Sequence, residues 1–146
     1  RLMWKDAVYE PGEVKVVAYN KDGKAVAEKT VRTAGKPHHI ELVSNRNELT
    51  ADGKDLAYVT VKVVDKDGNL CPTDSRLIHF SVKGAGKFRA VANGDPTNLE
   101  QFHLPKMHAF HGMLTAIVQA GEIAGDLVLT AKASGVKTGT VHLQAK

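Results

Sequence analysis

The sequence predicts an all-β protein that forms an antiparallel β-sandwich, preceded by the last strands of a second sandwich. In nearly every periodic segment, apolar and polar residues alternate with a period of two, which is typical of strands packed on one face. Turn sequences rich in glycine, aspartate and asparagine separate these segments. The segments are short and no amphipathic helical pattern lies between them, which favours a sandwich.

The start of the chain contains too few strands for a sandwich of its own. Three strands are expected there, over residues 2–8, 13–20 and 24–33. In the second of them, Val14, Val16 and Ala18 alternate onto one face. Three strands do not close a sandwich, so this face needs partners from elsewhere.

The rest of the chain supplies seven or more strands, enough for a complete sandwich. The clearest cover residues 56–65, 114–120, 126–133 and 140–145. Alternation predicts that one set of side chains points into the core: Val59, Val61, Val63, Leu114, Ala116, Val118, Leu127, Leu129, Ala131, Val141 and Leu143. Turns are expected at residues 21–24, 51–54, 66–69, 83–87 and 134–137.

The boundary between the two parts is expected in the segment TAGKPHH, where Gly35 and Pro37 interrupt the strand pattern. Residues 1–36 are therefore predicted to be the C-terminal strands of a preceding domain, and residues 37–146 a complete sandwich. A valine run followed by a Lys-Asp-Gly turn occurs once in each part, which favours two related domains.

Composition excludes several functional classes. The formal net charge is +4, but the lysines are scattered along the sequence and no basic cluster is interleaved with aromatics, so nucleic acid is not expected as a partner. No apolar run approaches the ~20 residues of a membrane span. Cys71 is the single cysteine, which leaves no internal disulfide. The opening RLMWKD has neither an initiator Met nor a signal peptide, and we expect a longer parent polypeptide.

Three stretches of the sequence resemble a known family. YEPGEVKVVAYNKDGKAVAEKTVRTAGKP (9–37) is similar to the end of an immunoglobulin-like domain that follows the catalytic barrel in bacterial family 2 glycoside hydrolases, the β-galactosidase group. Residues 40–72 and 92–120, the latter with Asn-Gly-Asp-Pro-Thr at 93–97, resemble the domain after it. The stretch from LTADGKD to HFSV is also similar to the immunoglobulin-like repeats of invasin- and intimin-type adhesins.

This resemblance implies an immunoglobulin-like antiparallel β-sandwich and a non-catalytic C-terminal accessory module of an exported, modular, β-galactosidase-like enzyme. The module would act in spacing, domain packing or substrate access, in the periplasm or at the cell surface. Its partners would be the catalytic barrel and the preceding sandwich domain. No cofactor is expected. A carbohydrate-binding module and an adhesin-type stalk repeat are the alternatives.

No catalytic residues are assigned. Retaining glycosidases hold two carboxyl groups about 5–5.5 Å apart on a rigid scaffold. In the resembling enzymes both lie on the barrel, and this chain is too short to form one. The fragment itself is therefore not expected to be an enzyme.

The segment NGDPTNLEQFHLPKMHAFHG (93–112) raises the question of a metal site, because it contains His103, His108 and His111. Zinc needs three or four such ligands converging on one point. On a strand, however, residues 108 and 111 would point to opposite faces. We therefore expect a long surface loop with solvated histidines and no metal, and keep the three histidines as weak candidates.

Carbohydrate binding depends on exposed aromatic rings, and few are available. Tyr58 alternates onto the outward face of its strand, and Phe102 lies in the histidine-rich loop. These two are the candidate carbohydrate-binding residues, although sequence does not place them together. The unpaired strands of residues 1–36 also predict self-association through exposed edges.

Overall fold

The structure, a computed structural model, describes residue 3 and residues 5–146, and these residues form strands and turns without a helix. The strands are β1 (Glu13–Tyr19), β2 (Ala25–Arg32), β3 (His39–Ser44), β4 (Glu48–Leu49), β5 (Leu56–Val64), β6 (Leu77–Gly84), β7 (Gly86–Ala92), β8 (Lys106–His108), β9 (Met113–Ala120), β10 (Gly125–Lys132) and β11 (Gly139–Ala145). The chain divides into two compact units, Arg1–Thr33 and Ala34–Lys146. Among the described residues no helix could cross a membrane.

The first unit is an antiparallel hairpin of β1 and β2. Its turn is closed by Asn20, whose side-chain oxygen accepts hydrogen bonds from the backbone N–H of Asp22 (3.0 Å) and Lys24 (2.9 Å). A strand was also expected over residues 2–8. This prediction is wrong for the described residues, since residues 3 and 5–8 are not in a strand. Residues 2 and 4 lie outside the described part of the chain.

One face of this hairpin is apolar and open. Val14 pairs with Val31, and Val16 lies two residues along on the same face. These side chains are 66%, 63% and 45% exposed, respectively. Among residue 3 and residues 5–33 no strand packs over this face, so the described hairpin lacks the packing that ordinarily stabilises a two-stranded sheet.

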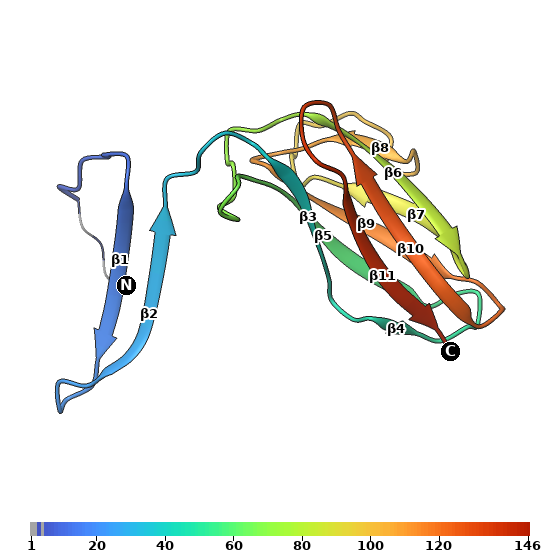
Figure 1. Ribbon diagram of the computed structural model, residues 1–146, viewed down its shortest axis with the longest axis horizontal. Coiled ribbons are helices and arrows are strands. Elements are labelled where there is room, and N and C mark those ends of the chain that lie inside the picture. The colour runs from blue at the N-terminus through green and yellow to red at the C-terminus, as the bar shows by residue number, and fades with distance from the viewer. Residues whose placement is uncertain (1–2, 4) are drawn as a thin grey trace. The chain divides into compact units, whose positions relative to one another are not determined.

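The second unit is a sandwich of two sheets, visible in Figure 1. One sheet has the order β3-β5-β9-β7, and the other has the order β4-β11-β10-β6-β8. Within the two sheets, neighbouring strands pair antiparallel except for the short β4 with β11. The all-β sandwich predicted from alternation is confirmed.

The core lies between the inner faces of these sheets. Val59, Val61 and Val63 of β5 are completely buried, because every second residue of a strand points to the same side. Leu127 and Leu129 of β10 are buried to the same degree in the opposite sheet. The predicted inward set is therefore confirmed in both sheets.

The chain changes sheets where β6 ends at Gly84 and β7 begins at Gly86. Gly84 has a φ of 93°, and a Cβ there would lie 2.0 Å from the backbone oxygen of Asp126. At Gly86 a Cβ would lie 2.0 Å from Cδ1 of Leu127. Glycine is required at this crossing because two backbones and a core side chain approach too closely for any other residue.

Asp65 fixes the start of the second unit to the turn after β5. Its carboxylate, 2% exposed, accepts hydrogen bonds from the backbone N–H of Gly35 (2.8 Å) and Asn69 (2.9 Å). These donors hold the pKa of Asp65 well below its usual range, with the Gly35 N–H as the largest cause. The DKDGN sequence is thus a turn organised by a carboxylate, and a Cβ at Gly35 would lie 3.5 Å from that carboxylate.

Candidate functional site

The histidine-rich segment is more ordered than the long loop that was expected. Within residues 93–112 the structure contains the strand β8, which pairs with β6, followed by a tight turn into β9. The expected uninterrupted loop is therefore corrected to a shorter loop of residues 93–105. The strand β8 could not be recognised from alternation, because it has only three residues.

Glu100 and His108 tie this loop to β8. One Glu100 oxygen lies 3.1 Å from Nδ1 of His108, and the other accepts a hydrogen bond of 3.1 Å from the His108 backbone N–H. The Asn93 side-chain amide donates to the His108 carbonyl at 3.0 Å. The backbone of His108 is thus held on both sides, and its imidazole has one protein partner, Glu100.

His111 has a conformational role. Residues 110–113 form a two-residue hairpin turn, with hydrogen bonds in both directions between Phe110 and Met113 (3.1 and 3.0 Å). Both central residues have positive φ, 51° at His111 and 73° at Gly112. This is the signature of a type I′ turn, and histidine is among the residues that tolerate this conformation.

The three candidate histidines do not converge. His103 is exposed on the 93–105 loop, His108 faces Glu100, and Nδ1 of His111 lies 3.3 Å from the Pro72 carbonyl oxygen. Within residue 3 and residues 5–146, no group of three or more His, Cys, Asp or Glu side chains is arranged to hold a metal ion. The absence of a metal site stays a prediction, because no metal measurement bears on it.

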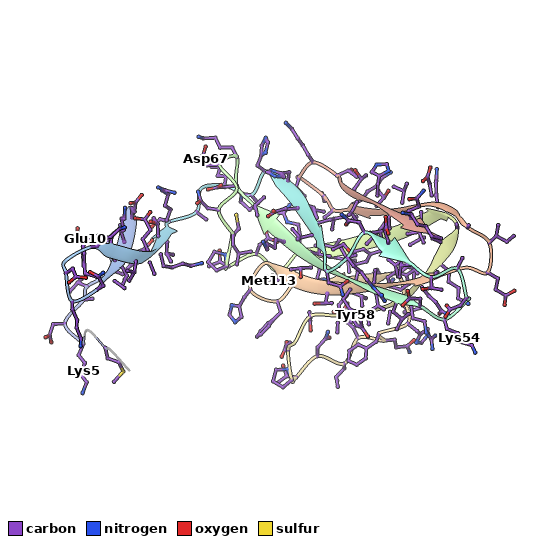
Figure 2. The ribbon with its side chains drawn as sticks, turned by 90° about the horizontal axis from the view of Figure 1, so that it is seen from below. Lys5, Glu10, Lys54, Tyr58, Asp67 and Met113 are labelled. Carbon is purple, nitrogen blue, oxygen red and sulfur yellow. The ribbon has the colours of Figure 1, made fainter. Side chains whose placement is uncertain are left out.

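Tyr58 lies on the outer face of the β3-β5-β9-β7 sheet. It is 47% exposed, and its register partner on β9 is Ile117, which in turn pairs with Ala90 of β7. The outward position expected from alternation is therefore found. Figure 2 shows Tyr58 on the side of the sandwich from which the 93–105 loop extends.

Phe102 reaches the same face from the loop. Its carbonyl accepts a hydrogen bond of 2.8 Å from the backbone N–H of Val91, and its ring is 56% exposed. Loop and sheet together border a shallow depression of about 610 Å³. Its lining residues are Leu56, Arg89, Ala90, Leu99, Glu100, Gln101, Phe102, His103 and Ile117. Ile117 therefore lies between the two candidate residues: it is the register partner of Tyr58, and it lines the same depression as Phe102.

The lining of this depression combines apolar and polar side chains. Leu56, Ala90, Leu99, Phe102 and Ile117 are apolar, while Arg89, Gln101 and His103 supply polar groups. Glu100 is the one carboxylate among its lining residues, and both of its oxygens are occupied by His108. A second carboxyl group, which glycoside hydrolysis requires, is not among the lining residues.

The other sheet carries a feature that the linear sequence does not reveal. Lys83, Lys106 and Lys132 are exposed on the outer face of the β4-β11-β10-β6-β8 sheet, on β6, β8 and β10. They are tens of residues apart in sequence, so charge patterning along the chain could not predict their grouping. Outward alternation combined with the correct strand pairing would have been needed.

Comparison with known proteins agrees with this architecture. The family model of the glycoside hydrolase family 2 C-terminal domain 5 matches residues 40–142. A model described as a domain of unknown function (DUF4982) matches residues 1–27. The change from one family model to the other falls within residues 28–39.

Relatives are large glycosidases. The beta-galactosidase BoGH2A of Bacteroides ovatus is 44% identical over 138 residues, which are 94% of this chain and 16% of that protein. A crystal structure of a family 2 member from Bacteroides cellulosilyticus has 31% identity and a TM-score of 0.88, and covers 96% of this chain and 18% of its own. A beta-glycosidase from Bacteroides vulgatus has 27% identity and a TM-score of 0.89, with 94% and 18% covered.

The chain therefore spans less than a fifth of the length of each of these three proteins. The family model covers most of the second unit and more than half of the whole chain. The resemblance read from the residues is confirmed: the chain belongs to the glycoside hydrolase family 2 C-terminal domain 5 family.

Proposed function

We propose that this chain is a non-catalytic accessory region of a β-galactosidase-like glycoside hydrolase, acting in domain packing, spacing and access of substrate to a catalytic domain elsewhere in the parent protein. The observation that carries the proposal is the fraction of each relative that the chain covers, 16% for the B. ovatus beta-galactosidase. An exported parent, working in the periplasm or at the cell surface, fits a module that meets long polysaccharides.

The chain alone should not hydrolyse glycosides. The test is to incubate purified residues 1–146 with aryl β-galactoside and aryl β-glucuronide, with the complete parent enzyme as the positive control. No release above a buffer blank is expected from the chain. Release of the aryl group that persists after further purification would contradict the non-catalytic assignment.

Residues 1–36 are proposed to complete a preceding domain, and residues 37–146 to form the accessory sandwich. Support comes from the open valine face of the hairpin, from the separate DUF4982 match, and from the division of the chain after Thr33. Burying a valine is worth at most about 1.5–3 kcal/mol, enough in sum to drive association when the natural partner is absent.

Light scattering tests this division. Residues 1–146 should self-associate through β1 and β2, and residues 34–146, which keep Gly35 bonded to Asp65, should be monomeric and folded. A monomeric 1–146, or a 34–146 without β-sheet circular dichroism, would show that the hairpin belongs to the sandwich.

A second candidate function is glycan contact at the depression that joins Phe102 to the sheet beside Ile117. Aromatic and aliphatic surface can cover the apolar face of a pyranose, and the neighbouring polar groups can bond its hydroxyls. Affinity electrophoresis in galactan is the measurement, and retardation should be lost in Tyr58→Ala and Phe102→Ala. Tyr19→Ala, which removes an aromatic ring 64% exposed on the hairpin, is the matched control.

A further inference from the structure

The outer face of the five-stranded sheet carries a group of basic side chains, three of them lysines, that the accessory role does not explain. We call the outward side chains of Lys83, Lys106, Lys132, His79 and His142 the lysine face; all five are exposed. They come from β6, β8, β10 and β11, which are neighbours in one sheet (Figure 1). The lysine face is thus a continuous surface of one sheet.

Strand register sets the spacing of these groups. His79 pairs with Lys106 on one side and with Lys132 on the other, so three basic residues form a row across β8, β6 and β10. Adjacent strands are about 4.8 Å apart, which places the two lysine backbones about 10 Å apart. Lys83 and His142 flank Val128 in a second row, four residues further along β6.

Acidic partners are missing from these rows. None of the five side chains has a hydrogen bond or ion pair with any residue of the described chain. Among the outward strand positions, Asp126 and Glu48 lie in the row at the end of the sheet, where Glu48 is already paired with Lys146. Beside β8, Glu100 is bonded to His108. The three lysines of this face therefore have no ion pair within the described chain that would account for their position.

Hydroxyl groups lie between the two basic rows. Thr130 pairs with Ser81 on one side and with Thr140 on the other, which forms a row of three hydroxyls across β6, β10 and β11. The outward positions of these strands contain no Phe, Tyr or Trp. The face therefore offers positive charge and hydrogen bonds, and its only rings are the imidazoles of the histidines.

We propose that the lysine face binds a linear acidic polysaccharide, a chain of pyranose units carrying carboxylate or sulfate groups. The basic rows would pair with the anionic groups and the hydroxyl row with the sugar hydroxyls between them. A nucleic acid fits less well, because single strands are held largely by stacking on aromatic side chains, and this face has no Phe, Tyr or Trp. The inference rests on this sheet alone and does not depend on the accessory function or on the depression at Phe102.

The test uses residues 1–146 and four probes: polygalacturonate for carboxylate, dextran sulfate for sulfate, dextran as the neutral polymer, and single-stranded DNA. Binding measured by titration calorimetry at low salt should be seen with at least one acidic polysaccharide, weaken as salt is added, and be undetectable with dextran. The carboxylate and sulfate arms decide which anion is preferred.

Variants locate the binding. Lys106→Gln combined with Lys132→Gln should weaken binding about tenfold, since each lost surface ion pair typically contributes a factor of a few. Lys36→Gln with Lys54→Gln removes the same charge from exposed positions outside the face and should change binding less than twofold. Lys132→Glu should weaken binding without lowering the melting temperature, because Lys132 is exposed and has no ion pair in the described chain.

Three results would overturn the proposal. They are absence of binding to both acidic polysaccharides, an equal loss in the control pair, or DNA binding as tight as that of the preferred polysaccharide. The first two would remove the site, and the third would reduce the face to a non-selective positive surface.

Discussion

Replacing Arg76 should destabilise the sandwich strongly, because its guanidinium neutralises a nearly buried carboxylate. Nε of Arg76 donates to Asp74 Oδ1 at 2.8 Å, and the terminal Nη2 donates to Oδ2 at 2.6 Å. The other terminal nitrogen, Nη1, donates to the Ser134 carbonyl at 2.6 Å and so joins the start of β6 to the β10–β11 connection. The side chain of Asp74 is 6% exposed, and that of Arg76 is 22% exposed.

Arg76→Ala would leave the Asp74 carboxylate and the Ser134 carbonyl without these donors. Removing one partner of a buried pair costs about 3–5 kcal/mol, and the partial exposure of Arg76 places the expected loss near the lower end, about 3 kcal/mol. For a domain of roughly a hundred residues this corresponds to a melting temperature about 12 °C lower. Thermal melts followed by far-ultraviolet circular dichroism measure it.

The matched control is Lys62→Ala. Lys62 and Glu41 form a partly exposed ion pair across β3 and β5, with a nitrogen–oxygen distance of 3.6 Å. Loss of this ion pair should lower the free energy of unfolding by about 0.2–1 kcal/mol. If Arg76→Ala melted no lower than Lys62→Ala, the carboxylate would be hydrated in solution and the reasoning would fail.

Acid should weaken the same interaction. Burial acts to raise the pKa of Asp74, but the hydrogen bonds from Arg76 outweigh it and the pKa lies below the usual value. A carboxyl group with a lowered pKa in the folded state contributes its full stability above its unfolded pKa of about 3.9, and loses it as the pH falls through the folded pKa. The difference in stability between wild type and Arg76→Ala should therefore narrow below about pH 4.

Further predictions concern packing, acid stability and metal binding. Gly86→Ala should cost about 1–3 kcal/mol in urea unfolding, since its Cβ would lie 2.0 Å from Leu127 Cδ1, whereas Gly121→Ala, with a nearest contact of 3.4 Å, should be nearly neutral. Asp65→Asn should melt at a lower temperature than wild type at pH 7, and the difference should shrink below pH 4. The reason is that the hydrogen bonds that lower the pKa of Asp65 stabilise only its ionised form, so a difference that did not change with pH would refute this. Tag-free chain should carry far less than one equivalent of zinc, nickel or copper by mass spectrometry, and a count near one that His108→Ala abolished would restore the metal hypothesis.

Strand positions were predictable wherever one face of a long strand is buried. The run LAYVTVKVV alternates over nine residues, and its inward valines are fully buried in β5. A register shift by one residue would turn every one of these side chains towards water, so a pattern of this length specifies both the strand and its inner face. The same alternation predicted that Tyr58 points to the outer face of the sheet, where the structure places it.

Shorter or unpartnered segments were not predictable. β8 has three residues and is formed because β6 offers it an edge, which is a tertiary effect absent from local alternation. Residues 5–8 belong to a segment that was expected to be a strand and form none in the described structure, where no neighbouring strand pairs with them. Neither the depression at Phe102 nor the lysine face could be predicted, because each depends on which strands become neighbours.

The two outer faces differ in a way that folding does not require. Stability comes from the inward residues of both sheets, and outward positions are mostly free to vary in composition. Stability alone would favour opposite charges across strands, as in the Lys62–Glu41 pair, on either face. Instead, the β3-β5-β9-β7 sheet presents Tyr58 and aliphatic surface beside Phe102, while the other sheet places His79 between two lysines. Lys83, Lys106 and Lys132 have no ion pair within the described chain, and the exposed rings add no core packing, so neither arrangement is required for the stability of the sandwich.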